Sequence, residues 1–158
     1  MDKLLKLLDS NARLSTSQLA AMLGRTEQEV ARQIAELEQS GVIRAYKALI
    51  DWDRTDREYV TAIIELRVSP KRDSGFESIA QSIMRLEEVE SVYLMSGGYD
   101  LSVVVTGRTF QEVAMFVAKR LSPMDAVLST ATHFVLRRYK DQGVMFLDEP
   151  RDEREYRE

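Results

Sequence analysis

The chain of 158 residues contains no cysteine, and histidine and tryptophan occur once each. Without cysteine it forms no disulfide, has no thiolate nucleophile and binds no zinc or iron–sulfur centre through sulfur. One imidazole, His133, is too few for a histidine-based metal site, so we predict no metal and no cofactor. We expect His133 to have a packing or interface role, and the single tryptophan, Trp52, to be a packing anchor.

Long apolar runs are also missing. No segment reaches the roughly 20 apolar residues that span a bilayer, and the opening MDKLLKLLDS lacks the long apolar core and cleavage site of a signal peptide. Hydrophobic residues make up 44% of the chain, which is enough for a small domain and a second compact one. We therefore expect a cytoplasmic protein with no membrane partner.

The chain has no overall excess of positive charge, since its formal net charge is −4. The distribution is uneven: residues 1–50 hold seven Lys and Arg against six Asp and Glu, whereas residues 148–158 hold three against six. The acidic excess thus lies away from the first third of the chain, so the overall charge does not exclude a nucleic-acid partner for that part. Because a segment with a net charge of +1 neutralises few phosphates, DNA binding would need several copies acting together.

Two helices joined by a tight turn are predicted between residues 15 and 41. Gly24 is suited to the left-handed conformation that ends the first helix. Thr26 and Glu29 form a capping-box pattern that begins the second, and Gly41 is placed to end it. The apolar residues at helical spacing, which would pack inward, are Leu19, Ala20, Leu23, Val30, Ile34 and Leu37.

The second of these helices is the candidate DNA-recognition helix. At about 100° per residue, Gln28 and Arg32 lie opposite its apolar stripe. Glutamine can pair with adenine, and arginine with guanine or a phosphate. Two helices around a glycine turn are also a common packing unit without a nucleic-acid role, and that alternative stays open. The candidate DNA-binding residues are Arg25, Thr26, Gln28, Arg32, Gln33, Arg44 and Lys47.

The rest of the chain alternates between strand and helix patterns. The expected strands are 59–68, 89–95, 101–106 and 127–139, and the expected helices 76–83 and 110–121. This βαββαβ order is that of a ferredoxin-like split unit. The fold class is therefore α+β, with an N-terminal winged-type helix-turn-helix domain and a C-terminal ferredoxin-like domain. Helices cover only one face of such a sheet, so we expect a second copy to cover the other.

The segment Ser96–Leu101, SGGYDL, is the candidate site for a small molecule. Adjacent glycines let backbone amides approach a carboxylate, and Asp100 can meet an amino group, which suits an amino acid zwitterion. The alternative is a plain hairpin turn, in which Gly97 and Gly98 take positive φ and Asp100 bonds its own backbone.

Two groups of motifs in this chain resemble those of the Lrp/AsnC transcription regulators. The first group is LAxxLG at Leu19–Gly24, VxxxIxxLE at Val30–Glu38 and SGVIRAYKALID at Ser40–Asp51; the second is SGGYDL. The resemblance covers residues 2 to about 142 and implies a DNA-binding transcription regulator that is not an enzyme. It also implies a homodimer formed through the second domain, often assembled into octamers or other higher forms.

The resemblance further implies an amino acid effector bound between subunits, near the glycine turn and the last strand. The implied effector-binding residues are Gly97, Gly98, Tyr99, Asp100, Thr130 and Thr132. For the two threonines, an ordinary place on a strand face is the alternative. One departure concerns Gln33, where family members often carry arginine; Arg32 leaves the helix about 100° away, so it need not substitute.

We divide the chain into four segments: a helix-turn-helix domain (1–42), a connecting strand and linker (43–58), a ferredoxin-like oligomerisation and ligand-sensing domain (59–142), and a charged tail (143–158). The connecting strand is predicted because 43–53 alternates apolar and polar residues.

Two other functions remain open. A tetrapyrrole decarboxylase of the same two-domain layout would use Arg137, Arg138 and Lys140 for substrate carboxylates, but one histidine and no cysteine leave little for acid–base work or iron ligation. A sensor-only module would use the helical pair for protein contacts.

Overall fold

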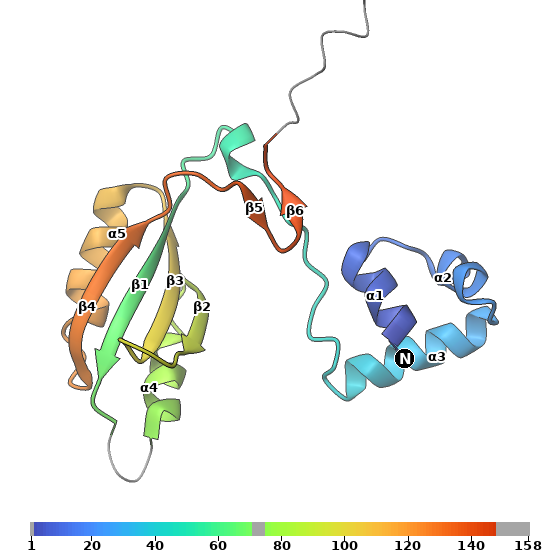
Figure 1. Cartoon of the computed structure of the whole chain (residues 1–158), viewed down its shortest axis with the longest axis horizontal. Coiled ribbons are helices and arrows are strands. Elements are labelled where there is room, and N and C mark those ends of the chain that lie inside the picture. The colour runs from blue at the N-terminus through green and yellow to red at the C-terminus, as the bar shows by residue number, and fades with distance from the viewer. Residues whose placement is uncertain (1, 71–74, 148–158) are drawn as a thin grey trace, which may run out of the picture. The chain divides into compact units, whose positions relative to one another are not determined.

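The computed structural model describes residues 2–70 and 75–147, and the chain divides into two compact units, Met1–Ile50 and Asp51–Glu158 (Figure 1). The first unit is helical, and the second is built around an antiparallel sheet. The division falls within the segment 43–58 that we expected to connect the domains. No helix in the described residues is long and apolar enough to cross a membrane.

The first unit consists of three helices, α1 (Asp2–Ser10), α2 (Thr16–Leu23) and α3 (Glu27–Gln39), and its described residues form no strand. Helices α2 and α3 are the predicted pair, and Gly24 ends α2 with a φ of 63°. Helix α1 was not predicted, yet it contributes two leucines to the core. The buried residues of this core are Leu4, Leu8, Leu19, Ala20, Val30 and Leu37.

Side-chain caps define where α2 and α3 begin. The Ser15 hydroxyl accepts a hydrogen bond from Gln18 N at 3.1 Å. Thr26 Oγ1 accepts from Glu29 N at 3.3 Å, while Glu29 Oε2 accepts from Thr26 N at 3.0 Å, which confirms the predicted capping box. This backbone hydrogen bond is the main reason that the pKa of Glu29 lies below its usual value. The caps satisfy donors that have no partner within the helix.

The prediction of a connecting strand over 43–53 is wrong for the single chain. Residues 44–50 have no regular structure, and a short 3₁₀ helix, η1 (Trp52–Arg54), follows. A strand needs a neighbour to satisfy its N–H and C=O groups, and none of the strands in the described chain pairs with this segment. Alternation of apolar and polar residues alone therefore does not make a strand here.

A tyrosine near each end of the connecting segment donates a hydrogen bond to a glutamate of the neighbouring unit. Tyr46 donates its hydroxyl to Glu38 Oε1 of α3 at 2.8 Å. Tyr59 donates to Glu90 Oε1 at 3.0 Å and stacks on Trp52, with ring centroids 5.5 Å apart. Burial, and then the bonded carboxylate, raise the pKa of both tyrosines. Trp52 thus packs within the segment, as predicted.

The second unit is a four-stranded antiparallel sheet in the order β2-β3-β1-β4. Its elements follow the predicted βαββαβ order: β1 (Val60–Val68), α4 (Gly75–Ile83), β2 (Val89–Leu94), β3 (Leu101–Gly107), α5 (Phe110–Phe116) with η2 (Val117–Leu121), and β4 (Val127–Phe134). Alternate residues of β1, among them Ala62, Ile64 and Leu66, are buried against the helices. Both helices pack on this one face (Figure 1).

The opposite face of the sheet, which we call the open face, has no helix over it. It presents Ile63, Glu65 and Arg67 of β1, and Ile63 lies between Val104 of β3 and His133 of β4. His133 Nε2 is 3.4 Å from Glu65 Oε1, and the histidine side chain is 58% exposed. His133 is therefore not packed inside the single chain, and its interface role stays a prediction.

Two boundaries in the second unit differ from those predicted. Strand β4 ends at Phe134 rather than Tyr139. A small hairpin of β5 (Lys140–Asp141) and β6 (Val144–Met145) crosses residue 142, where we had placed the end of the second domain. That predicted boundary was wrong. Gln142 and Gly143 both have positive φ, as a two-residue hairpin turn requires. The tail sequence 148–158 lies outside the described residues.

Candidate nucleic-acid interface and effector site

The exposed face of α3 carries two of the predicted DNA-binding side chains. Gln28 and Arg32 are exposed, while Val30 and Leu37 on the other side of the helix are buried. Arg32 Nε lies 3.8 Å from Glu36 Oε1, and both side chains are more than two-thirds solvent-exposed. Exposed ion pairs contribute at most about 1 kcal/mol. Arg32 can therefore exchange Glu36 for a phosphate or a base at little cost.

Arg25 and Gln33 come together across the turn before α3. The Arg25 Nη1 group donates a hydrogen bond to Gln33 Oε1, and Nη2 donates to the Glu29 carbonyl at 3.5 Å. The guanidinium thus lies against the position where family members often carry arginine. Positive charge reaches this part of the surface from the turn instead of from the helix. Sequence reasoning missed this pairing because the two residues are eight positions apart and belong to different elements.

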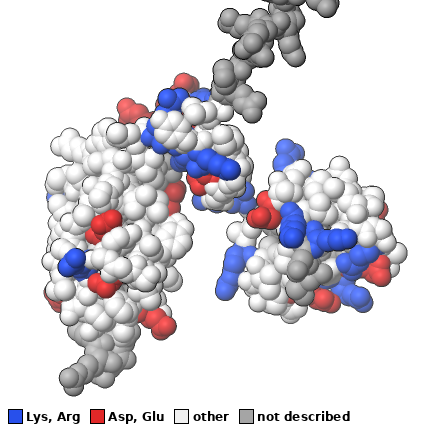
Figure 2. All heavy atoms as spheres, in the orientation of Figure 1, with Lys and Arg blue, Asp and Glu red and all other residues white. Residues whose placement is uncertain are grey.

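Helix α3 itself is acidic, with four glutamates and one arginine. Three of the glutamates have donors: Glu29 takes part in the N-terminal cap, Glu36 faces Arg32, and Glu38 accepts from Tyr46. The contact with Arg32 offsets one carboxylate charge, whereas the cap and the tyrosine hydroxyl orient the other two without neutralising them. Several basic side chains gather on the face of the first unit drawn in Figure 2.

The remaining basic candidates, Arg44 and Lys47, are exposed residues of the irregular segment after α3. The guanidinium of Arg44 lies over Gly41, with Cζ 3.5 Å from the position that a Cβ of residue 41 would occupy. Gly41 itself has a φ of 72°. The arginine charge is therefore held at the C-terminal end of α3.

The glycine turn at residues 97–100 is fastened to the end of β1. Asp100 Oδ2 accepts a hydrogen bond from Val68 N at 2.9 Å, and Asp100 N donates to the Leu66 carbonyl at 2.9 Å. Gly97 has a φ of 132°, whereas Gly98 does not have a positive φ. Tyr99 and Asp100 are half-buried. The carboxylate of Asp100 therefore has a structural role, because one of its oxygens accepts the backbone hydrogen bond from Val68.

The two threonine candidates, Thr130 and Thr132, lie on β4 opposite Leu66 and Ile64. This register places them on the face that the helices cover, and Thr130 Oγ1 is 3.4 Å from Ser122 Oγ. Strand β1 separates them from the glycine turn, which precedes β3, so the two groups are about 10 Å apart, or two strand spacings. In the single chain they do not form one site.

The arginines considered for a tetrapyrrole substrate are occupied by other contacts. Arg138 lies 3.6 Å from Asp141 and against the Phe146 ring, and Arg137 lies over the Tyr139 ring. The cavity beside these arginines measures about 130 Å³, well below the range of about 300–1,000 Å³ that holds a drug-sized ligand. These contacts favour a structural role for both arginines.

Comparison with known proteins agrees with both halves of this architecture. Residues 61–145 match the Lrp/AsnC ligand binding domain, and residues 3–44 match a winged helix-turn-helix DNA-binding domain. The uncharacterized HTH-type transcriptional regulator YugG of Bacillus subtilis (strain 168) is 48% identical over 145 residues, covering 91% of this chain and 87% of YugG. This chain belongs to the Lrp/AsnC family. It is a DNA-binding transcription regulator of that family.

Two further Lrp/AsnC comparisons extend along nearly the whole chain. The proline dehydrogenase transcriptional activator of Rhodobacter capsulatus is 26% identical to this chain. The matched region covers 89% of this chain and 91% of that protein. The crystal structure of the transcriptional regulator NMB0573 from Neisseria meningitidis, in complex with L-Met, has a TM-score of 0.73 at 24% identity. It covers 88% of this chain and 89% of that protein, so the two share the fold.

Proposed function

We propose that this Lrp/AsnC regulator acts in the cytoplasm, where a homodimer or larger homo-oligomer binds double-stranded DNA and responds to an amino acid, without an enzymatic step. The observation that carries the proposal is the exposed side of α3. Gln28, Arg32 and Gln33 project from its first two turns, and Arg25 reaches Gln33 from the turn before the cap. Side chains of this kind, at the N-terminal end of the second helix, read base edges in helix-turn-helix proteins.

Each candidate has a physical role in this interface. Gln28 and Arg32 face the major groove, and the small side chains of Ala31 and Ala35 allow the helix to approach closely. Thr26 caps the end of α3 at which the helix dipole is positive, and that end favours an anionic phosphate. Arg25, Arg44 and Lys47 serve phosphates, which position the protein without reading sequence.

A second copy is proposed to cover the open face of the sheet. That face carries exposed Ile63 and Tyr93 and half-buried Val104, with the His133–Glu65 pair among them. Pairing two such faces buries the apolar side chains and brings two copies of α3 onto one DNA molecule. Several copies acting together compensate for the low positive charge of one first unit.

The amino acid effector is proposed to bind at the glycine turn, with Gly97, Gly98, Tyr99 and Asp100 on one side. The related NMB0573 was crystallised with L-Met, which supports an amino acid ligand for this fold. Asp100 Oδ2 is used by Val68 N, which leaves the other carboxylate oxygen for an ammonium group. Thr130 and Thr132 would come from another subunit, because in one chain β1 separates them from the turn.

The proposal is tested by binding of the full chain to the DNA upstream of its own gene and to random DNA, at two salt concentrations, with and without an amino acid mixture. We expect preferential, steeply salt-dependent binding that changes with the mixture. Absence of binding at low salt would overturn the proposed DNA contacts and favour a sensor-only module.

Arg32→Ala tests the α3 surface directly. If Arg32 neutralises one phosphate, the slope of log affinity against log salt should flatten by about one unit. The measurement is fluorescence anisotropy of labelled DNA over a salt series. Arg85→Ala, which removes an exposed arginine from the second unit, is the matched control and should leave the slope unchanged. An unchanged slope for Arg32→Ala would remove this residue from the interface.

Asp100→Asn tests the effector site without disturbing the turn. Asparagine keeps an oxygen to accept the bond from Val68 N, whereas alanine would leave that N–H unpaired at a cost of about 1–3 kcal/mol. We expect the thermal midpoint and effector-free DNA binding to stay the same, and the response to amino acids to disappear. A retained response would return Asp100 to a purely structural role.

A further inference from the structure

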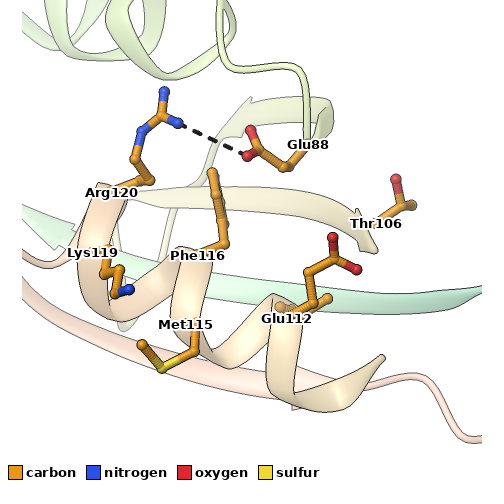
Figure 3. Close-up of a pocket in the computed structure, with 8 residues that line it drawn as sticks. Glu88, Thr106, Glu112, Met115, Phe116, Lys119 and Arg120 are labelled. Atoms are coloured by element: carbon orange, nitrogen blue, oxygen red, sulfur yellow. Dashed lines mark ion pairs between the residues drawn. The ribbon is translucent and has the colours of Figure 1, made fainter. Parts of the chain in front are cut away.

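A separate cavity of about 250 Å³ lies between α5 with η2 and the far end of β3 (Figure 3). Its polar lining is Glu88, Thr106, Glu112, Lys119 and Arg120, and Phe116 lies between them. Strand β3 runs from the glycine turn to Thr106, so the cavity and the turn are about 20 Å apart, at 3.4 Å per residue. None of the residues proposed for the effector lines it.

The charges in this cavity are separated into two ends. Figure 3 shows Arg120 and Lys119 at one end, and Glu112 with Thr106 at the other, on either side of Phe116. Two carboxylates and two basic groups make the lining neutral overall. A neutral site with opposite charges at its ends favours a neutral ligand with the same separation of charge, because a net ion would meet repulsion at one end.

The anionic end is fixed in position by the backbone. Glu112 Oε2 accepts a hydrogen bond from Arg108 N at 2.6 Å, and its second oxygen, Oε1, remains for another donor. Gly107 makes this arrangement possible, because a Cβ there would lie 2.9 Å from Val113 Cγ2. A side chain at residue 107 would therefore push α5 away from β3.

The cationic end is more adaptable. Arg120 Nη1 lies 3.9 Å from Glu88 Oε1, with the two side chains 52% and 37% exposed. A pair this long and this exposed is weak, so a ligand carboxylate can replace Glu88 at little cost. Lys119 has no ion-pair partner among the residues that the structure describes.

Both basic residues come from the π-helical turn η2, closed by Ser122 N donating to the Val117 carbonyl at 2.8 Å. Single π turns are rare and are found frequently at functional sites. The presence of a π turn in the wall of a cavity whose opposite charges lie at opposite ends is a second observation that points to a ligand.

Distances along the helix set the size of that ligand. Glu112 and Arg120 are eight residues apart, so their Cα atoms are separated by about 12 Å along the helix axis at 1.5 Å per residue, and by somewhat less across the π turn. An extended dipeptide spans about 7 Å, and charged hydrogen bonds of about 2.8 Å at each end bring the total to about 12–13 Å. A single α-amino acid, whose charged groups sit on neighbouring carbons, is too short to reach both ends.

We propose that this cavity binds a dipeptide-sized zwitterion with an apolar side chain. Its ammonium group meets Glu112 and Thr106, its carboxylate meets Arg120 and Lys119, and its side chain lies against Phe116. The volume of about 250 Å³, just below the usual range of about 300–1,000 Å³ for ligand pockets, limits the ligand to about two residues. The site is independent of the glycine turn and of the DNA interface.

The test is calorimetric titration of the full chain with the dipeptide Gly-Leu, compared with leucine, N-acetyl-Gly-Leu and Gly-Leu amide. We expect Gly-Leu to bind, and leucine and both capped dipeptides to bind at least ten-fold more weakly, because each lacks one of the two charged contacts. Equal binding of leucine, equal binding of a capped dipeptide, or no heat with millimolar Gly-Leu would each overturn the proposal.

Two variants test whether the dipeptide binds in this cavity. Glu112→Gln keeps an oxygen for Arg108 N, and Lys119→Met keeps the aliphatic stem, so both should fold and lose at least ten-fold in Gly-Leu affinity. Glu77→Gln on α4 and Lys140→Met on β5 are the matched controls. Binding of DNA without peptide should be unchanged in all four, which separates this site from the proposed DNA and amino acid functions. Unchanged Gly-Leu affinity in both cavity variants would overturn the assignment.

Discussion

Replacing Leu19 with alanine is expected to abolish DNA binding while the second unit stays folded. Leu19 is 1% exposed and belongs to a core in which six of the described residues are buried. Substitutions of this kind cost about 2–5 kcal/mol. At about 0.05–0.15 kcal/mol per residue, a unit of this size has a free energy of unfolding of only about 2.5–7.5 kcal/mol. The substitution therefore removes most of the stability of the first unit.

The measurement combines DNA binding with thermal unfolding followed by circular dichroism. Loss of the helical unit should lower the helical signal at room temperature and leave a cooperative transition from the sheet unit. Met22→Ala on the same helix is the control, because Met22 is 60% exposed and should be silent. Normal DNA affinity in Leu19→Ala would show that the first unit does not depend on this core.

Replacing Ile63 with glutamate is expected to convert the oligomer to monomers and to weaken DNA binding by about 10²-fold or more, through loss of avidity. Ile63 is 39% exposed in the single chain and lies in the middle of the open face, between Val104 and His133. The new carboxylate would be buried close to Glu65. In a two-fold symmetric interface the substitution occurs twice, so its cost is doubled.

Sedimentation velocity measures the oligomeric state, and DNA anisotropy measures the affinity. Met84→Glu is the matched control, since it places the same charge on an exposed apolar residue just after α4. If Ile63→Glu remains an oligomer, the open face is not the interface, and the copies must associate through another surface.

Local patterns in the sequence were sufficient for much of the fold. The capping box of Thr26 and Glu29 and the glycine at residue 24 correctly placed the turn between α2 and α3. The strand predicted over 59–68 is β1, and its apolar alternation matches the buried face that holds Ala62, Ile64 and Leu66. These features depend on residues within one or two turns of each other, so a linear sequence contains them.

Other elements needed partners that are distant in the sequence. Helix α1 has a short amphipathic pattern that becomes a helix through packing of Leu4 and Leu8 on the other two helices. Residues 44–50 of the alternating segment are irregular because none of the strands that the structure describes pairs with them. The threonines of β4 face the helices because the β1–β4 register places them there, a register that the sequence does not display.

The sequence by itself determined the family, the two-domain order and the helix-turn-helix pair, because caps, periodicity and short motifs are local. Only the tertiary structure decided that Arg25 lies on Gln33, that Asp100 fastens the glycine turn to β1, and that α5, η2 and β3 enclose a cavity with opposite charges at its ends. Each of these depends on side chains that are brought together from separate elements, and their distances are set by packing, which no local pattern encodes.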